Sequence, residues 1–93
     1  MMKEVYVHDV GMFLREAVEE FIRLLQGLGY AVKVNNSINC SITAIKNGDI
    51  VKIRFKPGGR NELGIQRTIV EIECKKDIHE KIQKKLYYLR GGG

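Results

Sequence analysis

The first long pattern in the chain places apolar residues at three- and four-residue intervals. From Asp9 to about Leu28 these residues form one stripe, and charged residues fill the opposite side. This spacing predicts an amphipathic helix with one buried face. Asp9 is the expected N-cap, because its carboxylate can accept hydrogen bonds from the free amides of the first turn. Gly27 and Gly29 are expected to end the helix. Residues 3–8 fit either a short strand or an irregular lead-in.

From Tyr30 onwards the apolar period changes from three or four residues to two. Alternating segments predict four strands, each with one buried face. They span about 30–34, 38–45, 51–56 and 65–75. Asn47-Gly48 predicts a two-residue hairpin turn between the second and third strands, because both residues tolerate positive φ. Segment 56–64 contains three glycines and is expected to be a loop whose backbone amides can approach an anion.

A second helix is predicted from Asp77 to about Leu89. Asp77 and Glu80 have the spacing of a capping box, which would leave His79 exposed in the first turn. The order helix, four strands, helix predicts a single small α+β domain built on an antiparallel meander. Both helices are expected to pack on one face of the sheet. The domain is expected to span residues 1–90, followed by a flexible glycine tail at 91–93.

Two parts of the chain show a partial resemblance to known families. The residues Leu89-Arg90-Gly91-Gly92 are similar to the end of ubiquitin-like modifiers, but those domains place strands before their helix. The order of elements resembles that of double-stranded-RNA-binding domains, which have three strands and a basic cluster opening the last helix. Here that helix opens with Asp77-Ile78-His79-Glu80. No site residue is therefore transferred from either family.

Composition narrows the classes of protein. The chain has 93 residues, a formal net charge of +5 and 44% hydrophobic residues, which excludes a multidomain enzyme and a disordered chain. No apolar run approaches the roughly 20 residues of a membrane helix, and the N-terminus lacks the apolar core of a secretory signal. Two cysteines cannot form a disulfide scaffold or a four-cysteine zinc site. We therefore expect a cytoplasmic protein with no membrane contact, metal or small-molecule cofactor.

The basic residues are concentrated in the second half of the chain. Residues 1–45 hold four Lys or Arg and five acidic residues, whereas residues 46–93 hold twelve and six. Basic residues at two-residue steps share one face of a strand, about 6.5–7 Å apart, which is close to the phosphate spacing of an extended nucleic acid strand. The predicted nucleic-acid surface comprises Lys33, Lys52, Arg54, Lys56, Arg60 and Arg67. Binding should have little sequence specificity, because the predicted face carries no aromatic residue for stacking.

Two other interpretations stay open for this face. Basic side chains are common on any solvated sheet surface, and the chain also fits a non-enzymatic homodimeric interaction module. The candidate interface residues are Ile45, Ile69, Tyr87 and Tyr88.

Catalysis is not expected from the sequence. His8-Asp9 and His79-Glu80 are adjacent pairs whose members do not face each other. Cys40 and Cys74 are expected to be small buried residues on inward faces.

Overall fold

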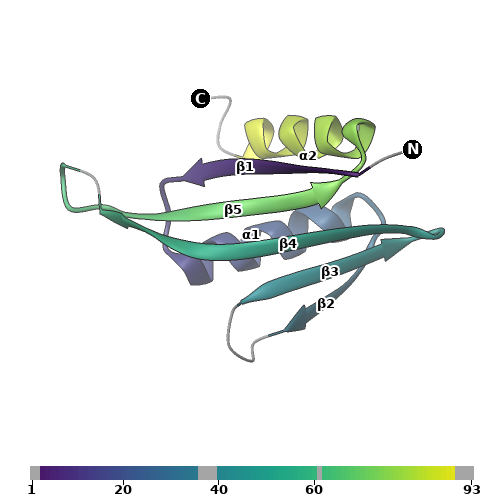
Figure 1. The fold of residues 1–93 in the computed structure, drawn as a ribbon, viewed down its shortest axis with the longest axis horizontal. Helices are drawn as coiled ribbons and strands as arrows, with labels where there is room; N and C mark the ends of the chain where they lie inside the picture. The colour runs from purple at the N-terminus through teal and green to yellow at the C-terminus, as the bar shows by residue number, and fades with distance from the viewer. Residues whose placement is uncertain (1–2, 36–39, 61, 90–93) are drawn as a thin grey trace.

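The computed structural model describes residues 3–35, 40–60 and 62–89, without the side chains of Tyr88 and Leu89. The elements follow in the order β1 (Glu4–Val10), α1 (Leu14–Gly27), β2 (Ala31–Asn35), β3 (Ser41–Lys46), β4 (Asp49–Arg60), β5 (Gln66–Cys74) and α2 (Lys76–Leu89) (Figure 1). The predicted glycine tail at 91–93 lies outside the described residues. Neither described helix is long and apolar enough to span a membrane.

The strands form one antiparallel sheet in the order β1-β5-β4-β3-β2. The α+β class is confirmed, and β2 to β5 follow one another as the predicted meander. The strand count of four is wrong, because residues 4–10 form a fifth strand that pairs with β5 along its whole length. Local periodicity left this segment undecided, since its strand character depends on a partner more than 50 residues away.

Both helices begin differently from the expectation. α1 begins at Leu14, so the N-cap prediction for Asp9 is wrong; Asp9 lies in β1, and Phe13 takes the N-cap position without a side-chain hydrogen bond. α2 begins at Lys76, which places Asp77 inside the first turn and makes the capping-box prediction wrong. The C-terminal end of α1 at Gly27 agrees with the prediction. Asp77 was misplaced because an acidic residue suits a first turn as well as a cap. Asp9 was misplaced because it pairs with Ile69 as part of β1.

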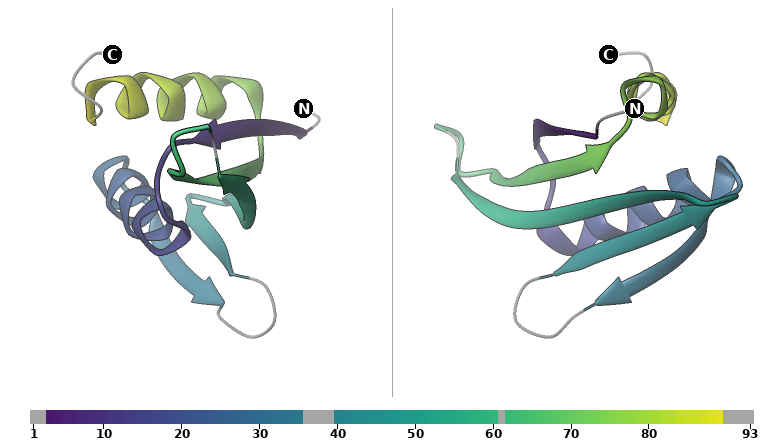
Figure 2. Two further views of the ribbon diagram at one scale, coloured as in Figure 1. Left: turned by 90° about the vertical axis from the view of Figure 1, so that its left-hand side faces the viewer. Right: turned by 45° about the vertical axis from the view of Figure 1, so that its right-hand side comes forward.

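One hydrophobic core lies between the helices and the inward face of the sheet. Alternate residues of β4 and β5 are buried there, and Phe55 of β4 meets Phe21 of α1 edge to face, with ring centroids 5.7 Å apart. α1 contacts β2, β3, β4 and β5. α2 contacts α1 and β5 and lies beside β1 at the end of the sheet (Figure 2). The helices therefore do not cover the sheet equally, a detail that differs from the predicted arrangement.

The hairpin between β4 and β5 is longer than expected. The prediction of a loop over 56–64 is wrong in its first half, because β4 continues to Arg60 with a register irregularity between Pro57 and Arg60. A Cβ atom at Gly58 would lie 3.2 Å from the Arg67 carbonyl oxygen, and Gly59 has φ of +78°. These two glycines allow the strand to bend and pair again. The resulting arm, residues 57–60 and 62–66, projects beyond the neighbouring strands (Figure 1).

The Asn47-Gly48 turn provides a test of the fold. Asn47 has φ of 48° and Gly48 has φ of 85°, as the hairpin prediction required. Gly48→Ala should lower the free energy of unfolding by about 1–2 kcal/mol, because an L side chain is strained in this conformation. The measurement is chemical denaturation. Gly11→Ala is the control: it is exposed, has an ordinary φ and no atom within 4 Å, so its change should stay within about 0.5 kcal/mol. If both variants lost the same free energy of unfolding, the interpretation of Gly48 as a position that requires positive φ would be wrong.

Candidate nucleic-acid interface

The outward side chains of the sheet form a face that the helices do not cover, termed here the open face. Lys33, Thr43 and Lys52 lie in one register row across β2, β3 and β4. Ser41 and Arg54 belong to the next row. The alternation in β4 is as predicted, since Lys52, Arg54 and Lys56 are exposed while the residues between them are buried.

Charge divides the open face into two parts. Four cations lie on β2 and β4 and are called here the cationic half: Lys33, Lys52, Arg54 and Lys56. Among the described residues of β2, β3 and β4, none of the outward side chains is acidic. The acidic residues lie on the two neighbouring strands, with Glu71 and Glu73 on β5 and Asp9 on β1.

Ion pairs cross the boundary between these parts. One oxygen of Glu71, Oε1, lies 3.2 Å from Arg54 Nε and 3.2 Å from Lys56 Nζ. Hydrogen bonds from these two cations lower the pKa of Glu71. Each exposed pair adds only about 0–1 kcal/mol to stability, so its main effect is to orient the two cationic groups. For Lys33 and Lys52, the described part of the chain provides no ion pair.

The remaining two predicted residues lie around the arm. Arg67 Nε donates a hydrogen bond to Asp9 Oδ1 at 2.9 Å, which ties the base of the arm to β1. Arg60 and Arg67 border an open hollow of about 420 Å³ together with Glu62 and Leu63. The structure therefore separates the six predicted residues into the cationic half and a smaller group at the arm.

The predicted interface residues do not form one surface. Ile45 is 49% exposed and lies opposite Ile50 at the turn end of the open face. Ile69 is half-buried between Lys56 and Asp9. Tyr87 is exposed on α2, and the side chain of Tyr88 lies outside the described residues. Sequence analysis missed two exposed apolar residues on β1, Val5 and Val7, because that strand was undecided.

A histidine pair that sequence analysis did not predict joins β1 to α2. His8 Nε2 and His79 Nε2 are 2.7 Å apart, and the Tyr6 ring stacks on His79 with centroids 3.6 Å apart. His79 is only 7% exposed, so the prediction of an exposed position is wrong. The short distance requires one ring to donate its Nε2 proton and the other to accept it. The two histidines are 71 positions apart in the sequence, which explains why no local motif could reveal the contact.

Burial disfavours the charged form of both rings. It lowers the pKa of His8, and burial together with the neighbouring His8 lowers the pKa of His79, which Glu80 partly opposes. The pair is therefore neutral at neutral pH, with one shared hydrogen bond. Within the described ranges, no group of three His, Cys, Asp or Glu side chains is placed to hold a metal ion.

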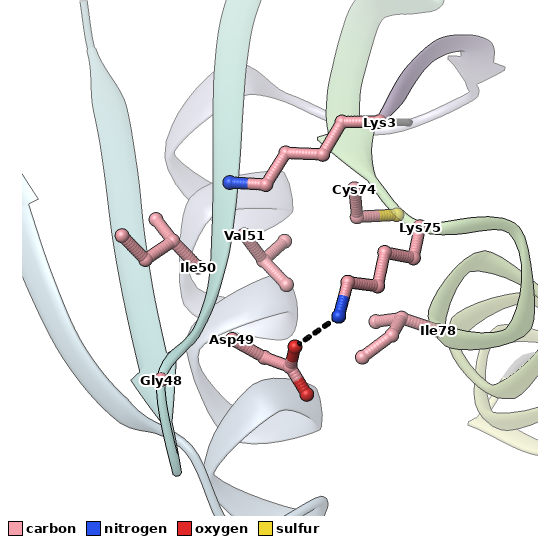
Figure 3. Close-up of a pocket in the computed structure, with 8 residues that line it drawn as sticks. All are labelled: Lys3, Gly48, Asp49, Ile50, Val51, Cys74, Lys75 and Ile78. Atoms are coloured by element: carbon pink, nitrogen blue, oxygen red, sulfur yellow. Dashed lines mark hydrogen bonds and ion pairs between the residues drawn. The ribbon is translucent and has the colours of Figure 1, made fainter. Parts of the chain in front are cut away.

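A small pocket lies where the β3–β4 turn meets the start of α2 (Figure 3). Its volume of about 60 Å³ matches roughly two water molecules. Lys75 Nζ donates to Asp49 Oδ1 at 2.7 Å across it, which holds the turn against the helix. Burial raises the pKa of the Cys74 thiol to about 11, so this cysteine is a poor nucleophile at neutral pH. Burial also raises the pKa of Cys40.

Comparisons with known proteins give one informative match. An uncharacterised protein of Archaeoglobus fulgidus is 40% identical over 86 residues, which cover 92% of this chain and 96% of that protein. No family model and no solved structure matches the chain.

The histidine pair predicts a specific pH dependence of stability. Because both pKa values lie below the ordinary value of about 6.5, the unfolded chain binds more protons once the pH falls below that value. The free energy of unfolding should be nearly constant between about pH 7 and 8 and fall from about pH 6.5 downwards. The slope of the unfolding free energy against pH cannot exceed about 1.4 kcal/mol per pH unit for each histidine.

Denaturation at stepped pH values measures this slope. The double variant His8→Gln, His79→Gln removes the only two histidines of the chain and should flatten the curve between pH 5 and 7. Asp49 and Glu71 also have lowered pKa values, but these change the stability mainly below about pH 4.5, outside this range. An unchanged slope in the double variant would contradict the assignment.

Proposed function

The chain belongs to the same family as the Archaeoglobus fulgidus protein, and we propose that it binds nucleic acid by phosphate contacts on the cationic half of the open face. The observation that carries this proposal is the grouping of four cations, Lys33 on β2 and Lys52, Arg54 and Lys56 on β4. The described outward positions of these two strands and of β3 between them hold no acid. The activity proposed is binding without catalysis or cofactor. A cytoplasmic location, where thiols stay reduced, fits it.

The spacing of these cations suits a phosphate backbone. Lys52, Arg54 and Lys56 repeat at about 6.5–7 Å along β4, and Lys33 lies two strands away, at about 9–10 Å. Thr43 lies between Lys33 and Lys52 in the same row, and Ser41 lies opposite Arg54. Their hydroxyl groups can donate to phosphate oxygens between the charged contacts.

The face has no means of reading bases by stacking. In the described chain, Tyr6 faces α2, Tyr30 is buried and Tyr87 is on α2, so none of them lies on the open face. Backbone contacts without stacking or base-edge contacts give affinity that depends on salt and little on sequence. Arg60 and Arg67 at the arm offer further contacts to a nucleic acid that extends past β4.

A homodimeric interaction module is the second candidate. The specific observation in its favour is the apolar row formed by Ile45, which is 49% exposed, and Ile50, which is 36% exposed. Such a contact would depend little on salt, whereas phosphate contacts depend on it steeply.

Removal of Lys33 and Lys52, the two cations of the cationic half that form no ion pair with a described residue, tests the nucleic-acid proposal. Lys33→Gln with Lys52→Gln should weaken binding to labelled DNA or RNA at least tenfold in low salt. The slope of log affinity against log salt should fall by about 1.4–1.8, because each lost phosphate contact contributes about 0.7–0.9. Fluorescence anisotropy at several salt concentrations measures both quantities.

The control has the same change of charge elsewhere. Lys81 and Lys84 are exposed on α2, away from the open face, and Lys81→Gln with Lys84→Gln should leave both quantities nearly unchanged. Equal losses in the two double variants would show a general charge effect and remove the assignment to the open face.

Glu71 should act as an internal competitor of phosphate. It holds Arg54 and Lys56 at 3.2 Å each, so a bound phosphate must replace it as their partner. Glu71→Gln removes this competing charge and should tighten binding several-fold while raising the salt slope. Glu16→Gln, at an exposed position of α1 on the other side of the sheet, is the control for the lost negative charge. Weaker or unchanged binding in Glu71→Gln would contradict a phosphate contact at Arg54 and Lys56.

A further inference from the structure

β2 is an edge strand whose backbone can pair with a further strand. It pairs with β3 on one side, and no described segment pairs with its other side. Over residues 31–34, such an edge offers backbone N–H and C=O groups to which another strand can add. Its side chains also remain accessible, since Ala31, Lys33 and Val34 are all exposed.

An apolar groove runs along the helix side of this edge. Leu14, Val18 and Ile22 follow one another at four-residue steps on α1, and Val34 of β2 also lines the groove. Arg15 and Glu19, one charge of each sign, complete the α1 side of the lining. Its volume of about 660 Å³ lies in the range of sites that hold a small ligand or a few side chains. α1 contacts β2 directly, so the groove is formed by the packing of the two elements.

A polar hollow lies on the other side of the same edge. Lys33, Asn35 and Thr43 line it together with Val34, and its volume is about 550 Å³. The two sides of β2 therefore differ in chemistry: the helix side is mainly apolar with one charge of each sign, and the open-face side is cationic and polar.

We propose that the β2 edge binds an extended peptide segment of a partner protein in which apolar and acidic residues alternate. Successive side chains of a strand point to opposite faces. A strand added beside β2 would thus place its apolar residues in the α1–β2 groove and its acidic residues beside Lys33. This mode of recognition takes affinity from main-chain hydrogen bonds and selectivity from the alternate pockets.

A second copy of this chain fits the edge poorly. Two antiparallel β2 strands related by a two-fold axis would bring the Lys33 side chains of both copies onto the same side, close to each other. Like charges opposite one another across strands are destabilising. An acidic partner meets no such repulsion, and this inference is independent of the proposed nucleic-acid binding.

The test uses synthetic peptides and amide shifts of the isotope-labelled full chain. The probe is an eight-residue peptide of alternating valine and glutamate, capped at both ends. It should shift the amides of residues 31–35 and of the groove side of α1. A second peptide carries N-methyl groups on the amides that would face β2, and it should lose most of the affinity because those donors are removed.

A charge exchange tests the orientation of the peptide. Lys33→Glu should weaken the valine–glutamate peptide about two- to fivefold and strengthen a valine–lysine peptide by a similar factor. Lys84→Glu on α2 is the control and should change neither. The proposal is overturned by an absence of shifts at β2 at millimolar peptide, by equal affinity of the N-methylated peptide, or by a concentration-dependent dimer through β2.

Discussion

The antiparallel pairing of β1 with β5 is the contact on which the rest of the structure depends. It joins the two ends of the chain across seven residue pairs and converts a four-stranded meander into a five-stranded sheet. The pairing also positions Thr68, whose buried hydroxyl donates to the Met12 carbonyl oxygen at 2.8 Å and so fixes the approach to α1. Because α2 follows β5 directly, the same pairing brings His79 to His8 and seats α2 beside β1. Such long-range pairing costs loop-closure entropy and is stabilised only once the strands and helices bury their common core.

The open face shows how a modest net charge is organised by the sheet. The chain carries +5 in total, but strand order places the acidic residues of β5 and β1 on one side of the cations of β4. Glu71 lies at this boundary and contacts both Arg54 and Lys56. These exposed ion pairs add little stability, and their effect is to hold long side chains in defined positions. A phosphate group that displaced Glu71 would meet cations already directed toward it. Lys33 and Lys52 would supply charge without having to leave an ion pair with any described residue, although Glu73 lies opposite Lys52 in the register.

Lys33 belongs to both of the surfaces proposed for this protein. Within the cationic half, Lys33 is the residue on β2. The same side chain borders the polar hollow beside the β2 edge. A partner strand with acidic residues at this edge would engage Lys33 and lower the positive charge offered to a nucleic acid. The two binding events would then oppose each other through one shared side chain, with a coupling no larger than the contribution of that single contact. Lys52, Arg54 and Lys56 would be unaffected, because they lie on β4.

The sequence by itself determined the elements whose pattern is local. Residue spacing predicts the apolar stripe of α1 and the alternation of buried and exposed residues in β4 and β5. The tolerance of asparagine and glycine for positive φ predicts the Asn47-Gly48 turn. All three agree with the structure. Only the tertiary structure decided the role of segments with weak or ambiguous periodicity. Residues 4–10 form a strand because they pair with β5. In that strand Asp9 forms an ion pair with Arg67 instead of capping a helix as predicted.

The candidate site likewise has one part that the sequence predicts and another that depends on the tertiary structure. The two-residue spacing of the β4 cations was enough to place them on one face. Three other features depend on contacts between residues distant in sequence, which no local pattern encodes: the ion pairs of these cations with Glu71, the histidine pair and the groove beside β2.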